Sequence, residues 1–171
     1  MARHTIQELQ SMITVWMGDC KTARGEKKLI TRDLGSCVGI AVRDPETGVG
    51  GLLHIMLPAY VPDGSGMSFN PAKYADTGID EMIRMLVQAG AARERLVAKL
   101  AGGAHMTRSP DVPEWNDISS RNLKAVRKKL GELQIPVLAE AVGAHHPRTV
   151  IFEPASGMLT IITAGRPDRV I

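Results

Sequence analysis

The sequence predicts an α+β fold in which two packed, mostly antiparallel β layers are flanked by two main helices. Short apolar runs bounded by turn residues are typical of strands, and two longer segments repeat apolar residues at helical spacing. At 171 residues, the chain is long enough to bury roughly 70% of its unfolded surface. We therefore expect one domain over residues 1–171, with residues 1–12 as an amphipathic or frayed lead-in.

The N-terminal half is expected to contain a first strand and a central hairpin. The alternating run 13–17 indicates the first strand, and the apolar runs 37–42 and 50–56 indicate the hairpin. The turn residues at 44–48 separate these two runs. A hairpin of this kind folds the second strand back beside the first, so that residues distant in sequence become neighbours.

Two amphipathic helices are expected to follow. The first has a stripe that ends at Gly90, a typical C-terminal cap, and the stripe consists of Ala75, Ile79, Met82, Ile83 and Leu86. The second has an apolar stripe of Leu123, Val126, Leu130 and Leu133. Its outer face is basic and carries Lys124, Arg127, Lys128 and Lys129.

Two long loops and four further strands complete the prediction. Loops are expected where Pro, Gly, Asp, Ser and Asn dominate, at 58–71, and again at 106–115. The turn residues 153–157 indicate a last hairpin. The remaining strands are predicted at 95–100, 135–140, 149–152 and 159–163.

Cys37 and His54 are the strongest candidates for catalytic chemistry. A free thiol with a pKa near ~8.5 is only a few per cent thiolate at neutral pH, so a cysteine nucleophile needs a base beside it. The predicted hairpin would bring His54 next to Cys37 although they are seventeen residues apart in sequence. The small residues Gly35 and Ser36 would let a substrate carbonyl approach backbone N–H groups.

Both candidates also have a purely structural explanation. A cysteine in a strand is often a small buried hydrophobe, and a histidine beside Leu and Ile is often a core residue. A disulfide between Cys20 and Cys37 is disfavoured, because no signal peptide is evident and such a chain is expected in a reducing compartment. We therefore expect both thiols to be free.

Two segments form a specific pair: Leu-Gly-Ser-Cys-Val around Cys37 and His-Ile-Met-Leu-Pro, which begins at His54. General hydrolases do not share this pair of segments at this spacing. Further distinctive segments are Asp44-Pro45, Lys73-Tyr74-Ala75-Asp76, Ala101-Gly102-Gly103-Ala104 and Arg121-Asn122. In order and spacing, all of these segments resemble the chemoreceptor glutamine deamidases called CheD. The resemblance runs from about Met17 to about Thr163.

The resemblance implies a fold like that of cysteine hydrolases and the activity of a protein-glutamine glutaminase. Such an enzyme hydrolyses glutamine side-chain amides of methyl-accepting chemoreceptors to glutamate and ammonia. The family's catalytic cysteine, histidine and threonine fall on Cys37, His54 and Thr31. Cys37 would attack the carboxamide carbon, and His54 would take the thiol proton and later protonate the ammonia. Thr31 would orient His54 through its hydroxyl, although an ordinary β-branched strand residue explains this position equally well.

The resemblance also implies partners. The substrate would be the cytoplasmic helices of chemoreceptors, and a CheC-type phosphatase is a second candidate partner. An alternative function is a non-catalytic chemotaxis adaptor that binds receptors or such a phosphatase. The 58–71 loop, which follows His54, is a natural lid, and the basic helix face is either solvated or a docking surface for an acidic receptor helix. We expect a cytoplasmic protein.

The chain departs from the family pattern at Ala144-His145-His146-Pro147-Arg148 and at Ile118-Ser119-Ser120. These changes put contacts with substrate or partners in doubt more than the chemistry. The pair His145 and His146 suggests a metal site, but no third ligand lies at a credible spacing. His105 is expected in a loop that could return to the cleft.

Composition argues against other classes of function. A net charge of +3 is modest, and basic residues are not interleaved with aromatic ones, so we expect no nucleic-acid binding. No apolar run approaches the ~20 residues that span a bilayer, so we expect no membrane insertion. The sequence has no Cys-x-x-Cys, His-Glu-x-x-His, phosphate-binding glycine-rich or Gly-x-Ser-x-Gly motif, which disfavours a redox or metal function. We expect no cofactor.

Overall fold

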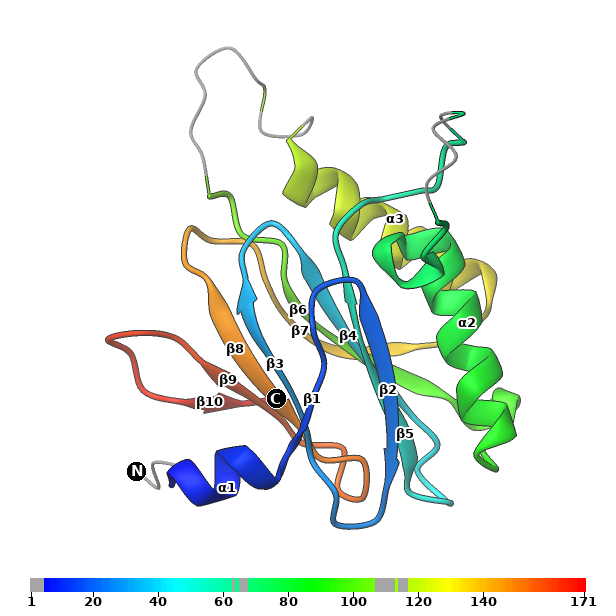
Figure 1. The fold of residues 1–171 in the computed structure, drawn as a ribbon, viewed down its shortest axis with the longest axis vertical. Coiled ribbons are helices and arrows are strands. Elements are labelled where there is room, and N and C mark those ends of the chain that lie inside the picture. Colours follow the sequence, from blue (N-terminus) through cyan, green and yellow to red (C-terminus); the bar gives the residue numbers. More distant parts are fainter. Residues whose placement is uncertain (1–4, 63, 65–67, 107–112, 114–116) are drawn as a thin grey trace.

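Two five-stranded sheets form the body of the structure, a computed structural model that describes residues 5–62, 64, 68–106, 113 and 117–171. The first sheet has the strand order β1-β3-β8-β9-β10 and the second has the order β2-β5-β4-β6-β7. The two long helices lie together on the second sheet (Figure 1). The α+β prediction with two mostly antiparallel layers is confirmed, since only the β1–β3 and β6–β7 pairs are parallel among the described strands.

The strands of the first sheet are β1 (Ile13–Thr14), β3 (Leu29–Leu34), β8 (Arg148–Phe152), β9 (Leu159–Ile162) and β10 (Arg169–Val170). Those of the second sheet are β2 (Asp19–Arg24), β5 (Val49–Ile55), β4 (Val38–Arg43), β6 (Val97–Gly102) and β7 (Val137–Val142). The helices are α1 (Ile6–Ser11), α2 (Ala75–Gln88) and α3 (Ile118–Glu132), with short 3-10 turns at Pro71–Lys73 and Arg93–Arg95.

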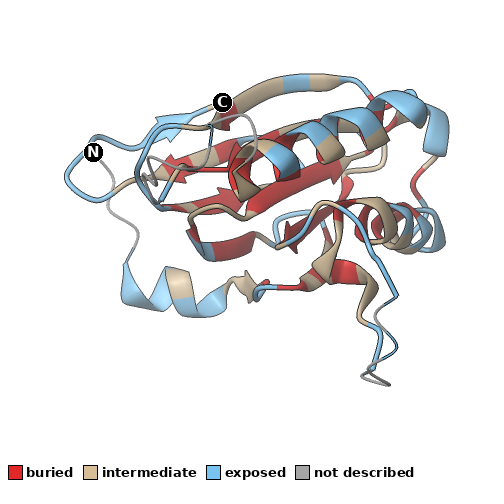
Figure 2. Cartoon of the chain, turned by 90° about the horizontal axis from the view of Figure 1, so that it is seen from above, coloured by how far each residue is buried: buried red, intermediate tan, exposed pale blue. Residues whose placement is uncertain are grey.

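Two hydrophobic clusters hold three layers together. One cluster lies between the helices and the second sheet and includes Leu53, Met82 and Leu130. The other lies between the two sheets and includes Leu52 and Phe152. The second sheet is therefore covered on both faces (Figure 2), which explains why its central strands β4 and β5 read as continuous apolar runs.

The central hairpin is confirmed, because β4 and β5 pair antiparallel in the register Val38↔Ile55 to Arg43↔Gly50. Its turn is fixed by the buried carboxylate of Asp44. That carboxylate accepts hydrogen bonds from the backbone N–H groups of Glu46 and Ala92 and from the guanidinium of Arg95. The Arg95 guanidinium holds the pKa of Asp44 well below its ordinary value.

The N-terminal part of the prediction needs correction. The predicted strand 13–17 is only two residues long, because the chain turns at Trp16–Gly18 and Gly18 has φ +68°. β2 was not predicted as a strand, since charged residues occupy its exposed positions. The lead-in forms α1, which has a Thr5–Glu8 capping box and no buried residue.

Both predicted helices are present, and their apolar stripes face the second sheet. α2 ends at the predicted glycine cap. The N–H groups of Gly90 and Ala91 donate to backbone carbonyls of its last turn, and Gly90 has φ +100°. Leu133 lies just beyond α3 at its C-cap. No helix in the described ranges is long and apolar enough to cross a membrane.

The basic face of α3 is less open than predicted. Lys129 forms an ion pair with Asp80 of α2 at 2.7 Å, and its side chain is only 19% exposed. Arg127 binds the carboxylate of Glu140 on β7 through two hydrogen bonds. Both residues therefore tie α3 to its neighbours, which weakens the interpretation of this face as a docking surface.

The predicted loops lie only partly within the described residues. Of the 58–71 loop, residues 63 and 65–67 lie outside the described part, and of the 106–115 loop only residues 106 and 113 lie inside it. The two ends of the first loop meet in an aromatic cluster. The ring of Tyr60 lies 4.4 Å from Phe69 and 5.2 Å from Tyr74, centroid to centroid.

Candidate active site

Thr31 and His54 meet between the two sheets. Thr31 lies on β3 of one sheet and His54 on β5 of the other, and both side chains are buried. Because strand side chains alternate, His54 points to the same face as Leu52, toward the other sheet. The Thr31 Oγ1 and His54 Nδ1 atoms are 2.8 Å apart and share a hydrogen bond.

Cys37 lies in the bend 35–37, between β3 and β4, and is half-buried. The prediction that it opens the hairpin strand is therefore wrong by one residue, since β4 begins at Val38. Gly39 of β4 is paired with His54 of β5. Cys37 thus precedes Gly39, the partner of His54, by two residues. Its side chain packs against the hydrophobic cluster between the two sheets.

A bulge precedes the bend that carries Cys37. The pairing of β3 with β8 shifts between Thr31 and Leu34, and Asp33 within the shift has φ +58°. Bulges of this kind re-aim side chains at the ends of strands. The bulge allows β3 to place Thr31 beside His54 and then turn the chain into the Cys37 bend.

The bend is held by backbone bonds from the segment after β6. The N–H of Gly103 donates to Cys37 O and the N–H of Ala104 donates to Gly35 O, both at 2.7 Å. A Cβ atom on Gly102 would lie 2.4 Å from Cys37 O, and Gly102 also has φ +97°. Only glycine fits this position, because any side chain would push the bend away.

Asn122 on α3 ties the Cys37 bend to the end of the His54 strand. Its Nδ2 group donates to Ser36 O at 3.1 Å and to Met56 O at 3.0 Å, and the side chain is fully buried. Sequence reasoning noted Asn122 only as part of a matching segment and assigned it no role. An asparagine on the buried side of an amphipathic helix was the signal that could have revealed it.

Two buried side-chain atoms in the described part of the chain lack a hydrogen-bond partner, and both belong to this site. They are His54 Nε2 and Asn122 Oδ1. Buried polar atoms without a partner are rare in folded proteins, and each one calls for an explanation. No hydrogen bond joins His54 to Cys37 within the described residues. The Nε2 atom of His54 is thus buried without a partner among the described residues.

Burial sets the protonation states of the pair. It raises the pKa of the Cys37 thiol, although the cysteine's own backbone N–H opposes this change. Burial lowers the pKa of His54 to about 4, with a small opposing effect from Asp33. At neutral pH the free protein therefore holds a thiol and a neutral imidazole. In this state burial, rather than the imidazole of His54, dominates the pKa of the Cys37 thiol.

The other three histidines that the structure describes form separate contacts. His105 Nδ1 is hydrogen-bonded to the carboxylate of Asp117 and lies 3.0 Å from Ser119 Oγ, at the start of α3. His145 Nδ1 contacts the backbone carbonyl of His105 at 3.1 Å, whereas His146 Nε2 lies 2.8 Å from an Arg166 nitrogen. No cluster of three metal-binding side chains occurs among the residues the structure describes.

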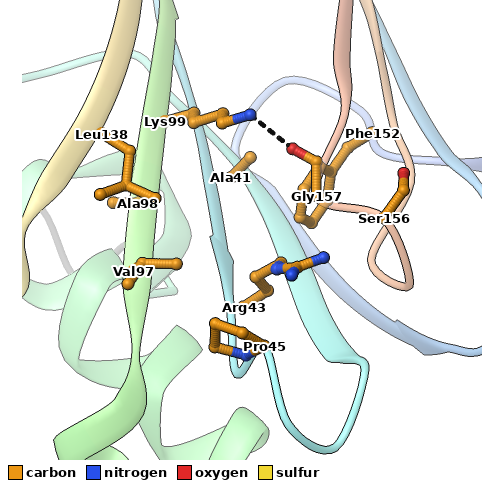
Figure 3. A pocket seen from close by; sticks show the side chains of 10 residues that line it. All are labelled: Ala41, Arg43, Pro45, Val97, Ala98, Lys99, Leu138, Phe152, Ser156 and Gly157. Carbon is orange, nitrogen blue, oxygen red and sulfur yellow. Dashed lines mark hydrogen bonds between the residues drawn. The ribbon is translucent and has the colours of Figure 1, made fainter. Parts of the chain in front are cut away.

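A cavity of about 100 Å³ lies between the sheets away from these residues (Figure 3). It is lined by Arg43 and Val97, at the ends of β4 and β6 opposite to Cys37 and Gly102. Lys99 points into this region and donates to Gly157 O at 2.7 Å. The cavity shares no residue with the candidate site.

Comparison with known proteins places the chain in a family. A family model described as CheD chemotactic sensory transduction matches residues 56–163. The chain belongs to the CheD family. It is 46% identical to a probable chemoreceptor glutamine deamidase CheD of Desulforamulus reducens, an alignment that covers 93% of this chain and 95% of the relative.

Two other relatives of the CheD family align over almost their whole length. The probable chemoreceptor glutamine deamidase CheD of Lachnoclostridium phytofermentans is 41% identical over 94% of this chain and 98% of its own. The chemoreceptor glutamine deamidase CheD of Halalkalibacterium halodurans is 40% identical over 95% of this chain and 100% of its own. Cys37, His54 and Thr31 all precede the residues that the CheD family model matches.

Proposed function

We propose that this chain is a chemoreceptor glutamine deamidase that hydrolyses glutamine side-chain amides to glutamate and ammonia. Cys37 is the nucleophile, His54 the general base and Thr31 the positioning residue. One observation carries the proposal. The hydroxyl of Thr31 is hydrogen-bonded to Nδ1 of the buried His54 imidazole, whose Nε2 atom has no partner among the described residues. His54 pairs with Gly39, two residues after the free thiol of Cys37. The names of the relatives support the same reaction.

The tautomer of His54 follows from its contact with Thr31. For Nε2 to accept a proton, Nδ1 must carry one and donate it to Thr31 Oγ1, which accepts at 2.8 Å. The low pKa of His54 keeps the imidazole neutral at pH 7, so that it is able to act as a base. The raised pKa of Cys37 means that its proton leaves during attack on the substrate rather than beforehand.

The reaction then proceeds in two steps. As the Cys37 sulfur bonds to the carboxamide carbon, its proton passes to His54 Nε2 and then to the departing ammonia, which leaves a thioester. Water, activated by His54, attacks the thioester carbon, and the thiol recovers its proton as glutamate is released. The N–H groups of Ser36 and Cys37 make no backbone hydrogen bond in the described chain, and they are suited to stabilise the oxyanion.

The substrate in this proposal is the cytoplasmic helical region of a chemoreceptor, and the protein acts in the cytoplasm. The rim that grips such a helix is formed by the ends of the 58–71 loop. Tyr60, Val61 and Phe69 are exposed there by 37%, 75% and 48%. An exposed group of large apolar side chains next to the His54 strand is typical of a protein-binding surface. The paired basic residues of α3 fit this role less well.

The decisive experiment is intact-mass analysis of a purified receptor cytoplasmic fragment before and after incubation with the protein. Each hydrolysed amide adds about one dalton, because an NH2 group is replaced by OH. Cys37→Ala and His54→Ala should each lower the rate by about three or more powers of ten while circular dichroism shows the fold intact.

Cys20→Ser is the matched control, because Cys20 lies in the core beside the helices and should leave the rate near that of the wild type. Near-normal mass shifts with folded Cys37→Ala would refute the assigned nucleophile. A wild-type protein that binds receptor, or a CheC-type phosphatase, without changing the receptor mass would instead favour the adaptor function.

A further inference from the structure

A second concave site lies outside the proposed catalytic centre. It is a cavity of about 350 Å³ between β7, the turn after β7 and the segment that joins β9 to β10. We call it the arginine pocket, because Arg148, Arg166 and Arg169 line it together with His146, Thr163 and Glu140. This volume is within the range that small-molecule ligands occupy in proteins.

The positive charge of the arginine pocket is not neutralised by carboxylates in the described chain. Glu140 is the one acidic residue among the described residues that line it, and both of its oxygens already accept hydrogen bonds from Arg127, at 3.0 and 2.5 Å. Arg148, Arg166 and Arg169 form no ion pair with a described carboxylate. Three guanidinium groups therefore share one cavity without a counterion of their own.

Arg148 shows that the site is built into the fold rather than scattered over the surface. It is only 9% exposed, and it donates to Gly102 O at 3.0 Å and to Gly143 O at 2.7 Å. These two bonds use only part of its N–H groups and fix the plane of the guanidinium. Burial lowers the pKa of Arg148, and the nearby positive charge of Arg166 lowers it further.

We propose that the arginine pocket binds an oxyanion of the phosphate class. Planar guanidinium groups match phosphate oxygens with paired hydrogen bonds, and the hydroxyl of Thr163 adds a neutral donor. A carboxylate would offset only one of the three charges, whereas a phosphate dianion offsets two. Arg166 and Arg169 are exposed and belong to the segment after β9, whereas the buried Arg148 is the first residue of β8.

An occupied pocket would also stabilise the end of the fold that carries Cys37. Arg148 holds Gly102 O, and the next residue, Gly103, donates its N–H to Cys37 O. A bound anion anchors Arg148 from the other side. Phosphate at a tenfold excess over its Kd should raise the melting temperature by roughly 3–6 °C.

The test is isothermal titration calorimetry of the full chain with sodium phosphate, and with sodium chloride or acetate at equal ionic strength. Phosphate should bind at a single site, and acetate and chloride should give no saturable heat. Arg166→Gln and Arg169→Gln should each weaken phosphate binding about tenfold, as expected for the loss of a charge-assisted hydrogen bond. Arg93→Gln, an equal charge change on an exposed residue outside the pocket, should leave Kd unchanged.

Three outcomes would overturn the proposal: no phosphate heat beyond that of chloride, equal binding of acetate and phosphate, or equal weakening by Arg93→Gln. Glycerol 3-phosphate, titrated in parallel, separates the two sources of the same chemistry. Tighter binding than inorganic phosphate assigns the pocket to a phosphate monoester, and weaker binding assigns it to free phosphate. None of these measurements depends on deamidase activity.

Discussion

Replacing Thr31 with valine tests the contact that crosses the two sheets. Valine keeps the β-branched shape of threonine but removes the hydroxyl that accepts from His54 Nδ1 at 2.8 Å. Both side chains are buried, so no solvent replaces the lost partner. Leaving a buried donor without an acceptor costs about 1–3 kcal/mol. Since His54 depends on this bond for its tautomer, the same cost should enter the barrier of the reaction.

In rate terms, about 1–3 kcal/mol corresponds to a decrease of kcat by roughly 5- to 150-fold. The assay is the time course of receptor mass increase at saturating receptor, with urea unfolding measured in parallel. Thr31→Ser is the matched variant, because it keeps the hydroxyl and loses one methyl group. We expect its kcat to stay within about fivefold of the wild type, although its unfolding free energy falls by about 1 kcal/mol.

The two variants together decide the role of Thr31. A kcat of Thr31→Val equal to that of the wild type would show that the hydroxyl does not position His54. An equal loss of kcat in Thr31→Ser and Thr31→Val would show that packing at this position, rather than the hydrogen bond, supports activity.

Three further predictions follow from burial and hydrogen bonding around the site. Iodoacetamide should alkylate Cys37 well before Cys20, because Cys20 is buried and its pKa is raised to about 12. Peptide mass mapping measures the two alkylation rates, and equal rates would contradict this prediction. Asn122→Leu should lower both kcat and the unfolding free energy in urea, the latter by about 2–4 kcal/mol, since two backbone carbonyls lose their donor. Unchanged stability would show that the bonds from Asn122 do not hold the Cys37 bend to the His54 strand. The pKa of His54 is lowered from 6.5 to about 4 in the folded protein, so the unfolded state binds its proton first as pH falls. As the pH falls from 6.5 to 4, the unfolding free energy of the wild type should therefore decrease relative to that of His54→Gln. Above pH 6.5, His54 should have no effect on the pH dependence of stability. Stability curves that run parallel for the two proteins would refute this prediction.

Apolar patterning was sufficient to predict the most buried elements. The central hairpin and both long helices follow from continuous or helically spaced apolar residues, and their boundaries agree with the structure to within a few residues. β2 escaped prediction because its exposed positions carry charged residues such as Lys21, and the two-residue β1 was predicted too long. These strands are defined by their pairing with partners rather than by their own sequence.

For the candidate site, local sequence was enough to select Cys37 and His54. The small residues before Cys37 and the position of His54 on the second strand are both features of a single hairpin. The contact of Thr31 with His54 joins different sheets, and the bonds from Asn122 join a helix to two distant backbone segments. Pairwise spacing in the sequence contains no information on such contacts. Resemblance to the family, not periodicity, suggested Thr31.

The sequence by itself determined which residues are apolar, where the chain turns and which side chains have the chemistry of a nucleophile and a base. The tertiary structure decided their protonation, because burial between two sheets raises the pKa of Cys37 and lowers that of His54. It also decided which basic residues are free to bind a partner. Arg127 and Lys129 form ion pairs with carboxylates of neighbouring elements, whereas Arg148 faces a cavity. Such pairing depends on distances between charges, which only the folded chain sets.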